Sequence, residues 1–205
     1  MEKRKIKIAV LVSGGGTNLQ AILDYQRAGK LKNGEVVAVI ASNPNAYALK
    51  RAENFGVQGF VVSRKGLSQN DFESGIISRL EEVGAEVIVL AGFMSILSAE
   101  FTKKYENRII NVHPSLIPSF CGEGFYGLRV HEAALGYGVK VTGATVHFVN
   151  EVADGGKIIM QKAVKIKDGD TPEILQQRVM REAEWIILPK SLDKVCKSVL
   201  KGEIK

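Results

Sequence analysis

The sequence predicts an α/β fold: a single-domain, doubly wound, mostly parallel mixed sheet with an antiparallel C-terminal pair of strands and a long C-terminal helix. Continuous runs of Val, Ile and Leu alternate with helix-like stretches, which is typical of parallel strands buried on both faces. A chain of 205 residues is long enough for one sizeable core. Because no internal repeat or low-complexity linker divides the chain, residues 1–205 are expected to form one domain.

The first part of the chain carries the alternating pattern. Buried strands are expected at 7–12, 35–41, 59–63, 86–92 and 108–113. Helices are expected between them at 18–28, 46–55, 69–83 and 98–105. This order of strands and helices favours a parallel sheet that is covered by helices on both faces.

The pattern changes after Pro118. Two strands flank a turn at Asp154-Gly155-Gly156, and strands joined so closely pair antiparallel. A long helix is expected from about Thr171, since Thr-Pro-Glu is a typical helix start. The expected elements of this part are a loop rich in glycine and aromatic residues at 119–127, a helix at 128–137, strands at 141–149 and 157–166, and the final helix.

Composition excludes several classes of protein. The chain is 45% hydrophobic and 24% charged, ordinary values for a soluble globular protein. No apolar run approaches the ~20 residues of a membrane span, and the apolar N-terminal run is too short for a signal peptide. A cytoplasmic protein without membrane contact is therefore expected. The formal charge of +6 favours anionic partners, but the terminal lysines lack interleaved aromatic residues, so a small anion is favoured over nucleic acid.

The cysteines and histidines do not predict a metal site. Cys121 and Cys196 lie far apart in the sequence, and neither belongs to a Cys-x-x-Cys or Cys/His pattern. Cys121 could meet His113, His131 and His147 around zinc, but the spacings are irregular. Free thiols and no metal are expected.

A glycine loop at 13–18 joins the first expected strand to the first expected helix. Glycines let a backbone approach a ligand closely, and the start of a helix offers free N–H groups to an anion. The loop lacks the lysine of a phosphate-binding Walker A loop, and Leu19 stands where a dinucleotide-binding motif needs glycine. A single phosphate group is therefore favoured. The alternative is a structural turn in which Thr17 caps the helix.

Asn111 and His113 lie at the end of the fifth expected strand. Side chains alternate along a strand, so these two face the same side. Pro114 ends the strand and places the pair at the rim of the sheet, where ligands bind in open α/β folds. An amide donates without titrating, whereas an imidazole also exchanges protons, so the pair suits an oxyanion that develops on a carbonyl. The alternative is a polar pair that only closes the strand.

A carboxylate is expected to hold His113. Asp154 is favoured because its glycine-rich turn lies at a strand end, whereas Asp168 and Asp170 are typical turn residues. For His147 the sequence indicates a supporting or structural role as strongly as a catalytic one. No Ser or Cys lies in a nucleophile motif, so acyl transfer is expected to be direct, without a covalent enzyme intermediate.

Four segments carry a resemblance to a known family. They are VLVSGGGTNLQAIL, VLAGFMSILS, IINVHPSLIPSF and GATVHFVNEVADGGKIIMQ. Over about residues 6–190 the chain resembles the phosphoribosylglycinamide formyltransferases, the folate-dependent enzymes of purine synthesis, with their Rossmann-like fold. The Asn-x-His-Pro-Ser-Leu-x-Pro block marks the wider formyltetrahydrofolate-using superfamily, and the glycine loop narrows it to this branch.

The resemblance implies a reaction and its site. The donor would be 10-formyltetrahydrofolate as co-substrate, and the acceptor would be N1-(5-phosphoribosyl)glycinamide, also called glycinamide ribonucleotide. Asn111 and His113 would stabilise the tetrahedral intermediate, and Asp154 would orient His113 and help to move a proton. The substrate-binding residues would be Gly16, Thr17 and Asn18 for the phosphate, Glu184 near the acceptor amine, and Met94, Ser95, Ile96, Leu97 and the loop from Asn150 to Asp154 for the pterin. No metal is implied, and a monomer or homodimer is expected.

The chain departs from the family pattern at three places. Ser95 stands where the family commonly has Arg. The loop at 119–127 is longer than the usual Pro-Gly link. The segment 178–189 is one residue longer than the family spacing.

Three rival functions are considered. Formyltetrahydrofolate deformylases resemble the chain in the Asn-His-Asp centre but use water as acceptor, and they usually carry an N-terminal regulatory domain for which no room is expected here. Methionyl-tRNA formyltransferases lack this glycine loop and add a C-terminal RNA-binding domain, for which the chain is expected to end too early. A non-catalytic module that binds a phosphorylated ligand would explain the glycine loop alone.

Overall fold

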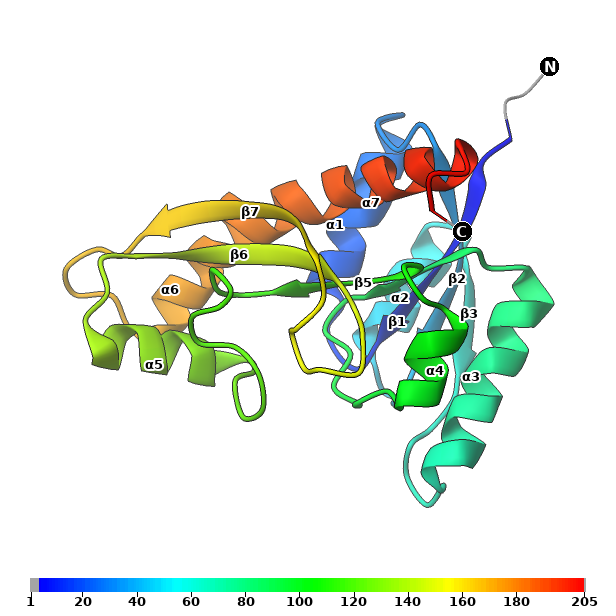
Figure 1. Cartoon of the computed structure of the whole chain (residues 1–205), viewed down its shortest axis with the longest axis horizontal. Helices are drawn as coiled ribbons and strands as arrows, with labels where there is room; N and C mark the ends of the chain where they lie inside the picture. The colour runs from blue at the N-terminus through cyan, green and yellow to red at the C-terminus, as the bar shows by residue number, and fades with distance from the viewer. Residues whose placement is uncertain (1–3, 205) are drawn as a thin grey trace.

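The computed structural model describes residues 4–204, which form one seven-stranded sheet with helices on both sides (Figure 1). The strands are β1 (Ile6–Val12), β2 (Gly34–Ala41), β3 (Gln58–Val61), β4 (Val87–Leu90), β5 (Ile109–His113), β6 (Val141–Phe148) and β7 (Ile158–Lys165). The helices are α1 (Thr17–Arg27), α2 (Tyr47–Asn54), α3 (Gln69–Val83), α4 (Ala99–Lys104), α5 (Leu128–Tyr137), α6 (Pro172–Val179), the π-helix η1 (Met180–Glu184) and α7 (Trp185–Leu200).

The sheet is mixed, as the sequence predicts. Its strand order is β3-β2-β1-β4-β5-β6-β7. The pairs from β3 to β5 are parallel, whereas β5 with β6 and β6 with β7 are antiparallel. The chain reverses the direction of strand addition between β3 and β4, on the two sides of β1. This is the switch point at which ligands bind in open α/β sheets.

Two apolar layers hold the sheet between helices. On one face, buried residues of α1, α2, α6 and α7 form one cluster with the strands; Ile22, Leu192 and Val10 of β1 are among its members. On the other face, Phe72 and Ile76 of α3 belong to a second cluster with Phe101 of α4. Alternate residues of β1, β2 and β4 complete this cluster. Parallel strands that are buried on both sides explain the continuous Val/Ile/Leu runs of the sequence.

The prediction of one long C-terminal helix is wrong in one respect, because this part of the chain forms three consecutive helical segments, α6, η1 and α7. Its start is confirmed: the Thr171 hydroxyl accepts a hydrogen bond from the Ile174 N–H at 3.3 Å, and Pro172 follows the cap. The five-residue π-helix then separates α6 from α7. A π-turn takes up an additional residue while the helix continues. Such a turn is where the one extra residue expected in segment 178–189 would fit.

Other differences from the expected elements are confined to their ends. The strand expected at 86–92 spans only Val87–Leu90, because the positive φ of Gly92 (69°) turns the chain away from the sheet. The helix expected at 98–105 begins one residue later, because Ser98 is its cap and accepts from the Phe101 N–H at 3.1 Å. The helices expected at 69–83 and 128–137 are confirmed.

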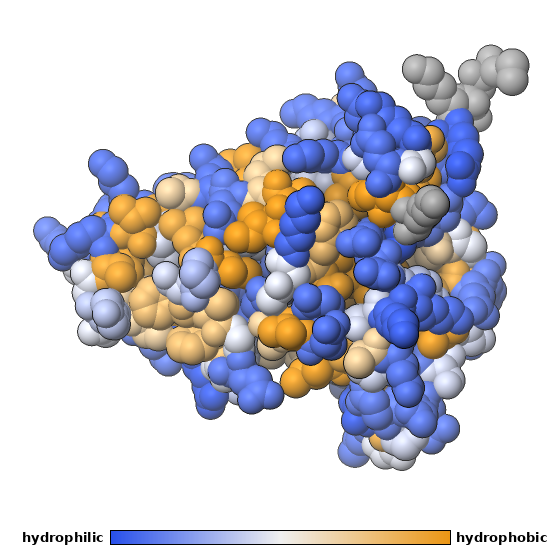
Figure 2. Space-filling model, viewed as in Figure 1, coloured by the Kyte–Doolittle hydropathy of each residue, from blue (hydrophilic) through white to orange (hydrophobic). Residues whose placement is uncertain are grey.

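The surface is unevenly polar. Figure 2 shows hydrophobic residues over β6 and β7 on this face, and mostly hydrophilic residues around α3. Among residues 4–204, no helix is both long and apolar enough to cross a bilayer.

Candidate active site

The loops that follow β1 and β4 touch each other at the rim of the sheet. The Ser13 N–H donates to the Gly92 carbonyl at 3.1 Å, and the Met94 N–H donates to the Ser13 hydroxyl at 2.9 Å. The same hydroxyl lies 2.7 Å from the Ser42 hydroxyl, at the end of β2. These contacts bring the glycine loop and the Met94 loop together, as expected from the placement of polar residues at strand ends.

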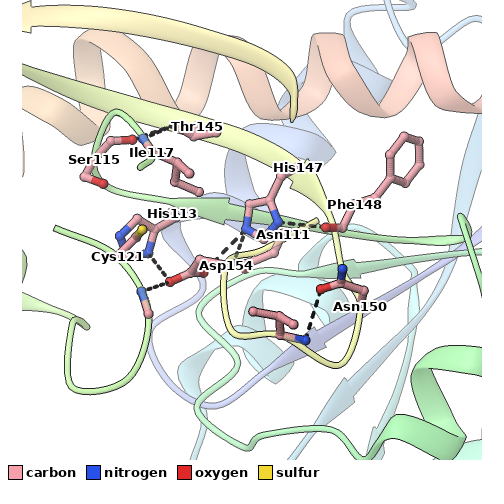
Figure 3. Close-up of polar contacts among 12 residues, drawn as sticks. Asn111, His113, Ser115, Ile117, Cys121, Thr145, His147, Phe148, Asn150 and Asp154 are labelled. Atoms are coloured by element: carbon pink, nitrogen blue, oxygen red, sulfur yellow. Dashed lines mark hydrogen bonds and ion pairs between the residues drawn. The ribbon is translucent and has the colours of Figure 1, made fainter. Parts of the chain in front are cut away.

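Asn111 and His113 both lie on β5, and the antiparallel neighbour β6 places His147 opposite Asn111. Figure 3 shows Asn111, His113, His147 and Asp154 turned toward one another. The Asn111 amide nitrogen lies 3.3 Å from His147 Nε2. His113 and His147 are 4% and 2% exposed, so both rings are shielded from water.

Asp154 enters the cluster from the turn between β6 and β7. It adopts a φ of 54°, in the left-handed region, and its carboxylate points back toward β5 (Figure 3). Its Oδ2 lies 3.3 Å from His113 Nδ1, and its Oδ1 lies 3.5 Å from His147 Nε2. The Gly122 N–H also donates to Oδ2 at 2.9 Å. Burial would raise the pKa of Asp154, but contacts with His147, the Gly122 N–H and His113 outweigh it and lower the pKa, so the residue is a carboxylate.

The two ring nitrogens of His113 face different oxygen atoms: Nε2 faces the Phe120 carbonyl, and Nδ1 faces the Asp154 carboxylate. Its Nε2 lies 2.8 Å from the Phe120 carbonyl oxygen, which can only accept, so Nε2 carries the proton. Burial lowers the pKa of His113, although Asp154 and the Phe120 carbonyl oppose the shift. The neutral ring therefore directs an N–H at a carbonyl oxygen, and it can gain a second proton on the side of Asp154.

His147 is the fourth member of this cluster. Its Nδ1 lies 2.8 Å from the Phe148 carbonyl oxygen and must carry a proton. Its Nε2 lies 3.3 Å from the Asn111 amide nitrogen and 3.5 Å from Asp154 Oδ1, so the ring lies between these two residues. The supporting role of His147 stays a prediction.

The glycine loop has the geometry of an anion site. Gly16 is the N-cap of α1, with φ 71° and ψ 34°, and no side chain caps this helix. The alternative in which Thr17 caps the helix is therefore wrong: Thr17 is already the first helical residue, so its own N–H belongs to the open turn. A left-handed residue followed by helical ones turns successive N–H groups toward one point.

Glu184 lies beside the glycine loop, on the last turn of η1. Its Oε2 accepts from the Asn18 amide at 2.7 Å, and both residues are buried. Burial raises the pKa of Glu184 to about 7, with the Asn18 hydrogen bond opposing the shift. The π-helix thus places Glu184 against a residue of the expected phosphate loop.

The pKa of Glu184 leads to a prediction about stability. Between its usual pKa of 4.5 and its folded value of about 7, the folded protein binds more protons than the unfolded one, so stability falls as pH rises. Glu184→Gln removes this titration and keeps an oxygen for Asn18. We expect the variant to be more stable than the parent by up to about 3 kcal/mol at about pH 8, and equally stable near pH 4.5. Urea unfolding at both pH values measures the difference in stability between the variant and the parent. A difference that does not change with pH would contradict the titration of Glu184.

The residues expected to bind the pterin lie in two exposed loops. Met94 and Ile96 are 60% and 77% exposed, so their side chains are open to a ligand. Leu97 is buried in the core on the α3 side and can offer only its backbone. Ser95 is half-buried, and the Asn150 side chain accepts from the Val152 N–H at 3.1 Å, which shapes the turn that carries Asp154.

Several contacts of this site were not predicted from the sequence. The Phe120 carbonyl and the Gly122 N–H are backbone groups, and their residue types carry no signal. The only sign was the unusual length of loop 119–127. The buried Glu73 carboxylate was also missed: its oxygens accept from the Ser98 N–H and hydroxyl, each at 2.6 Å, and so hold the end of the Met94 loop.

The remaining candidates have structural roles or lie apart. Asp170 forms a bidentate ion pair with Arg178, which lowers the pKa of Asp170 to about 2. His131 is fully buried, neither of its ring nitrogens has a hydrogen-bond partner within the described part of the chain, and burial lowers its pKa to about 4. Cys121 and Cys196 are free thiols. No group of three or more His, Cys, Asp or Glu residues within 4–204 is arranged to hold a metal ion.

Comparison with known proteins identifies the family of this chain. Residues 6–192 match the family described as formyl transferase. The chain is 40% identical over 184 residues to phosphoribosylglycinamide formyltransferase of Haemophilus influenzae, covering 89% of this chain and 84% of that protein. It is 43% identical over 196 residues to the trifunctional purine biosynthetic protein adenosine-3 of Gallus gallus, covering 95% of this chain but only 19% of that protein.

Solved structures give the same result. The crystal structure of glycinamide ribonucleotide transformylase 1 from Symbiobacterium toebii superposes with a TM-score of 0.88 at 40% identity, covering 95% of this chain and 89% of that one. The seven-stranded mixed sheet thus agrees with the fold of this solved structure. The chain belongs to the formyl transferase family.

Proposed function

We propose that this protein transfers the formyl group of 10-formyltetrahydrofolate to the amine of N1-(5-phosphoribosyl)glycinamide, a step of purine biosynthesis. The observation that carries the proposal is the convergence of Asn111, His113 and Asp154 at the end of β5, at the same edge of the parallel sheet as the loops that follow β1 and β4. The names of the relatives support the choice of the acceptor and of a formyl group as the group transferred.

The side chains have distinct roles in this reaction. The acceptor amine attacks the formyl carbon, and its oxygen gains negative charge in the tetrahedral intermediate. An amide N–H of Asn111 and the N–H of His113 donate to that oxygen. The bond from carbon to the folate nitrogen then breaks, and the folate nitrogen takes up the proton that the amine loses. Asp154 stabilises the positive charge on His113 as the proton moves, with water as the carrier.

The Phe120 carbonyl indicates where the formyl oxygen lies. It accepts from His113 Nε2 at 2.8 Å, the geometry that the reacting carbonyl needs. Both oxygens cannot occupy this position, so substrate binding displaces the Phe120 carbonyl. Loop 119–127 therefore moves when the donor binds.

The two substrates occupy the two loops of the rim. The phosphate of the acceptor binds the N–H groups of Gly16, Thr17 and Asn18, and Glu184 contacts the acceptor near its amine. The pterin binds against the loop of Met94, Ser95, Ile96 and Leu97 and the turn from Asn150 to Asp154. The exposed hydrophobic side chains of Met94 and Ile96 then lose their contact with water.

We further propose that residues 1–205 act as one formyltransferase domain in the cytoplasm, as a monomer or homodimer, without nucleic acid, membrane or metal. The positive formal charge of +6 suits the acceptor phosphate and the folate carboxylates.

A transfer assay with and without the acceptor tests the function. We expect tetrahydrofolate to form only when glycinamide ribonucleotide is present, together with a formylated acceptor. Equal formation of tetrahydrofolate without acceptor would indicate a deformylase and contradict the proposal. If no product formed under either condition, the proposal would also be contradicted, and a non-catalytic binding module would be the remaining function.

A further inference from the structure

We propose that Arg51 of α2 is a positioning residue for the acceptor phosphate, because it fixes the direction of the N–H groups in the glycine loop. The inference rests on the proposed function for the identity of the anion. Arg51 itself belongs to none of the motifs that indicate the site, and it lies on a different helix from the loop.

Helix α2 donates hydrogen bonds to two carbonyl groups of the glycine loop, those of Gly14 and Gly15. The Gly14 carbonyl accepts from the Ala48 N–H at 3.1 Å. The Gly15 carbonyl accepts from Arg51 Nε at 2.8 Å. A Cβ on Gly16 would lie 2.7 Å from Ala48 Cβ, so the loop backbone rests directly on this helix.

These two bonds orient the next two N–H groups. A peptide bond is planar and trans, so the C=O of one residue and the N–H of the next point in opposite directions. Because the carbonyls of Gly14 and Gly15 point at α2, the N–H groups of Gly15 and Gly16 point away from it. Neither N–H donates to another group within residues 4–204. With the N–H groups of Thr17 and Asn18 they form an open cradle for an anion.

The Arg51 guanidinium is itself held in place. Its Nη1 donates to the Gln20 side-chain oxygen at 2.8 Å, and the Gln20 amide nitrogen donates to Asp24 at 3.0 Å. Arg51 also lies over the Tyr47 ring, 5.0 Å from its centroid. The planar fork can thus bind Gly15 and Gln20 at once, whereas the single ammonium of lysine cannot reproduce this geometry.

The test compares two acceptors in two variants. Glycinamide ribonucleotide carries the phosphate, and glycinamide riboside is the same molecule without it. In Arg51→Met, we expect the ratio of kcat/KM between ribonucleotide and riboside to fall about tenfold, because only the ribonucleotide uses the cradle. Lys50→Met is the matched control. It removes a charge from the same helix, but among residues 4–204 Lys50 pairs only with Glu53, so the ratio is expected to stay unchanged.

Two more measurements separate the geometry of the Arg51 side chain from its charge, and phosphate binding from activity. Arg51→Lys keeps the charge, and we expect it to recover only part of the ratio. Inorganic phosphate binding, measured by calorimetry, is expected to weaken in Arg51→Met and not in Lys50→Met, whether or not the protein is active. An unchanged ratio in Arg51→Met, or an equal fall in Lys50→Met, would overturn the inference. Wild-type protein that formylates neither acceptor would instead refute the proposed function, and the phosphate measurement would still test Arg51.

Discussion

Asp154→Asn is expected to lower kcat by about a hundredfold or more while leaving both KM values largely unchanged. The variant suits the site because asparagine tolerates the left-handed φ of 54° and keeps one oxygen to accept from the Gly122 N–H. What it loses is the negative charge 3.3 Å from His113 Nδ1. Without that charge, His113 cannot gain a second proton at low cost, and the proton transfer of the reaction becomes slower.

Asp168→Asn provides the control for this experiment. Asp168 lies in an exposed turn and, like Asp154, is followed by a glycine. Its replacement removes the same charge from the protein, and kcat is expected to remain within about twofold. Steady-state kinetics with both substrates and circular dichroism give the comparison. Near-normal kcat in Asp154→Asn would remove this residue from the mechanism, whereas equal losses in both variants would point to a general effect of charge.

The sheet could be predicted because its signals are local. Strands buried on both faces need uninterrupted Val, Ile and Leu, and Ser68 and Thr171 cap their helices through their own side chains. The same holds for Asn111 and His113, since strand alternation alone places them on one side of β5. Asp154 required only one further assumption, that a short turn between paired strands returns its residues to the strand ends.

The missed features depend on contacts between distant segments. A π-helix differs from an α-helix by one residue, and no residue type among Met180–Glu184 demands it. Its consequence is specific, because it aligns Glu184 with Asn18, far away along the chain. The Phe120 and Gly122 contacts are made by backbone, and Arg51 reaches the glycine loop from another helix. None of these has a sequence pattern of its own.

Loop 119–127 and the glycine loop differ in whether their site groups are already hydrogen-bonded. Loop 119–127 contributes both the carbonyl on His113 and the N–H on Asp154. Within residues 4–204 the N–H groups of Gly15 and Gly16 in the glycine loop donate to no other group. On the proposed function, the acceptor phosphate would bind without rearrangement of the catalytic cluster, whereas the formyl group would not.

Gly16→Val is expected to lower kcat/KM for the acceptor by about a hundredfold or more, with little change in donor binding. Two physical effects add at this position. Valine is strongly disfavoured at a φ of 71°, and its Cβ would lie 2.7 Å from Ala48 Cβ. The loop must shift away from α2, and its N–H groups then lose their common direction.

Gly29→Val separates the local effect from a loss of stability. Gly29 follows the other end of α1 with a φ of 67°, but a Cβ there meets nothing within 4 Å. Both variants pay the cost of a positive φ, about 1 to 2 kcal/mol, which urea unfolding measures. Only Gly16→Val should weaken the acceptor, as followed by steady-state kinetics, while folate binding followed by fluorescence stays intact in both. If Gly16→Val weakened donor and acceptor equally, the loop would be a structural turn and the phosphate would bind elsewhere.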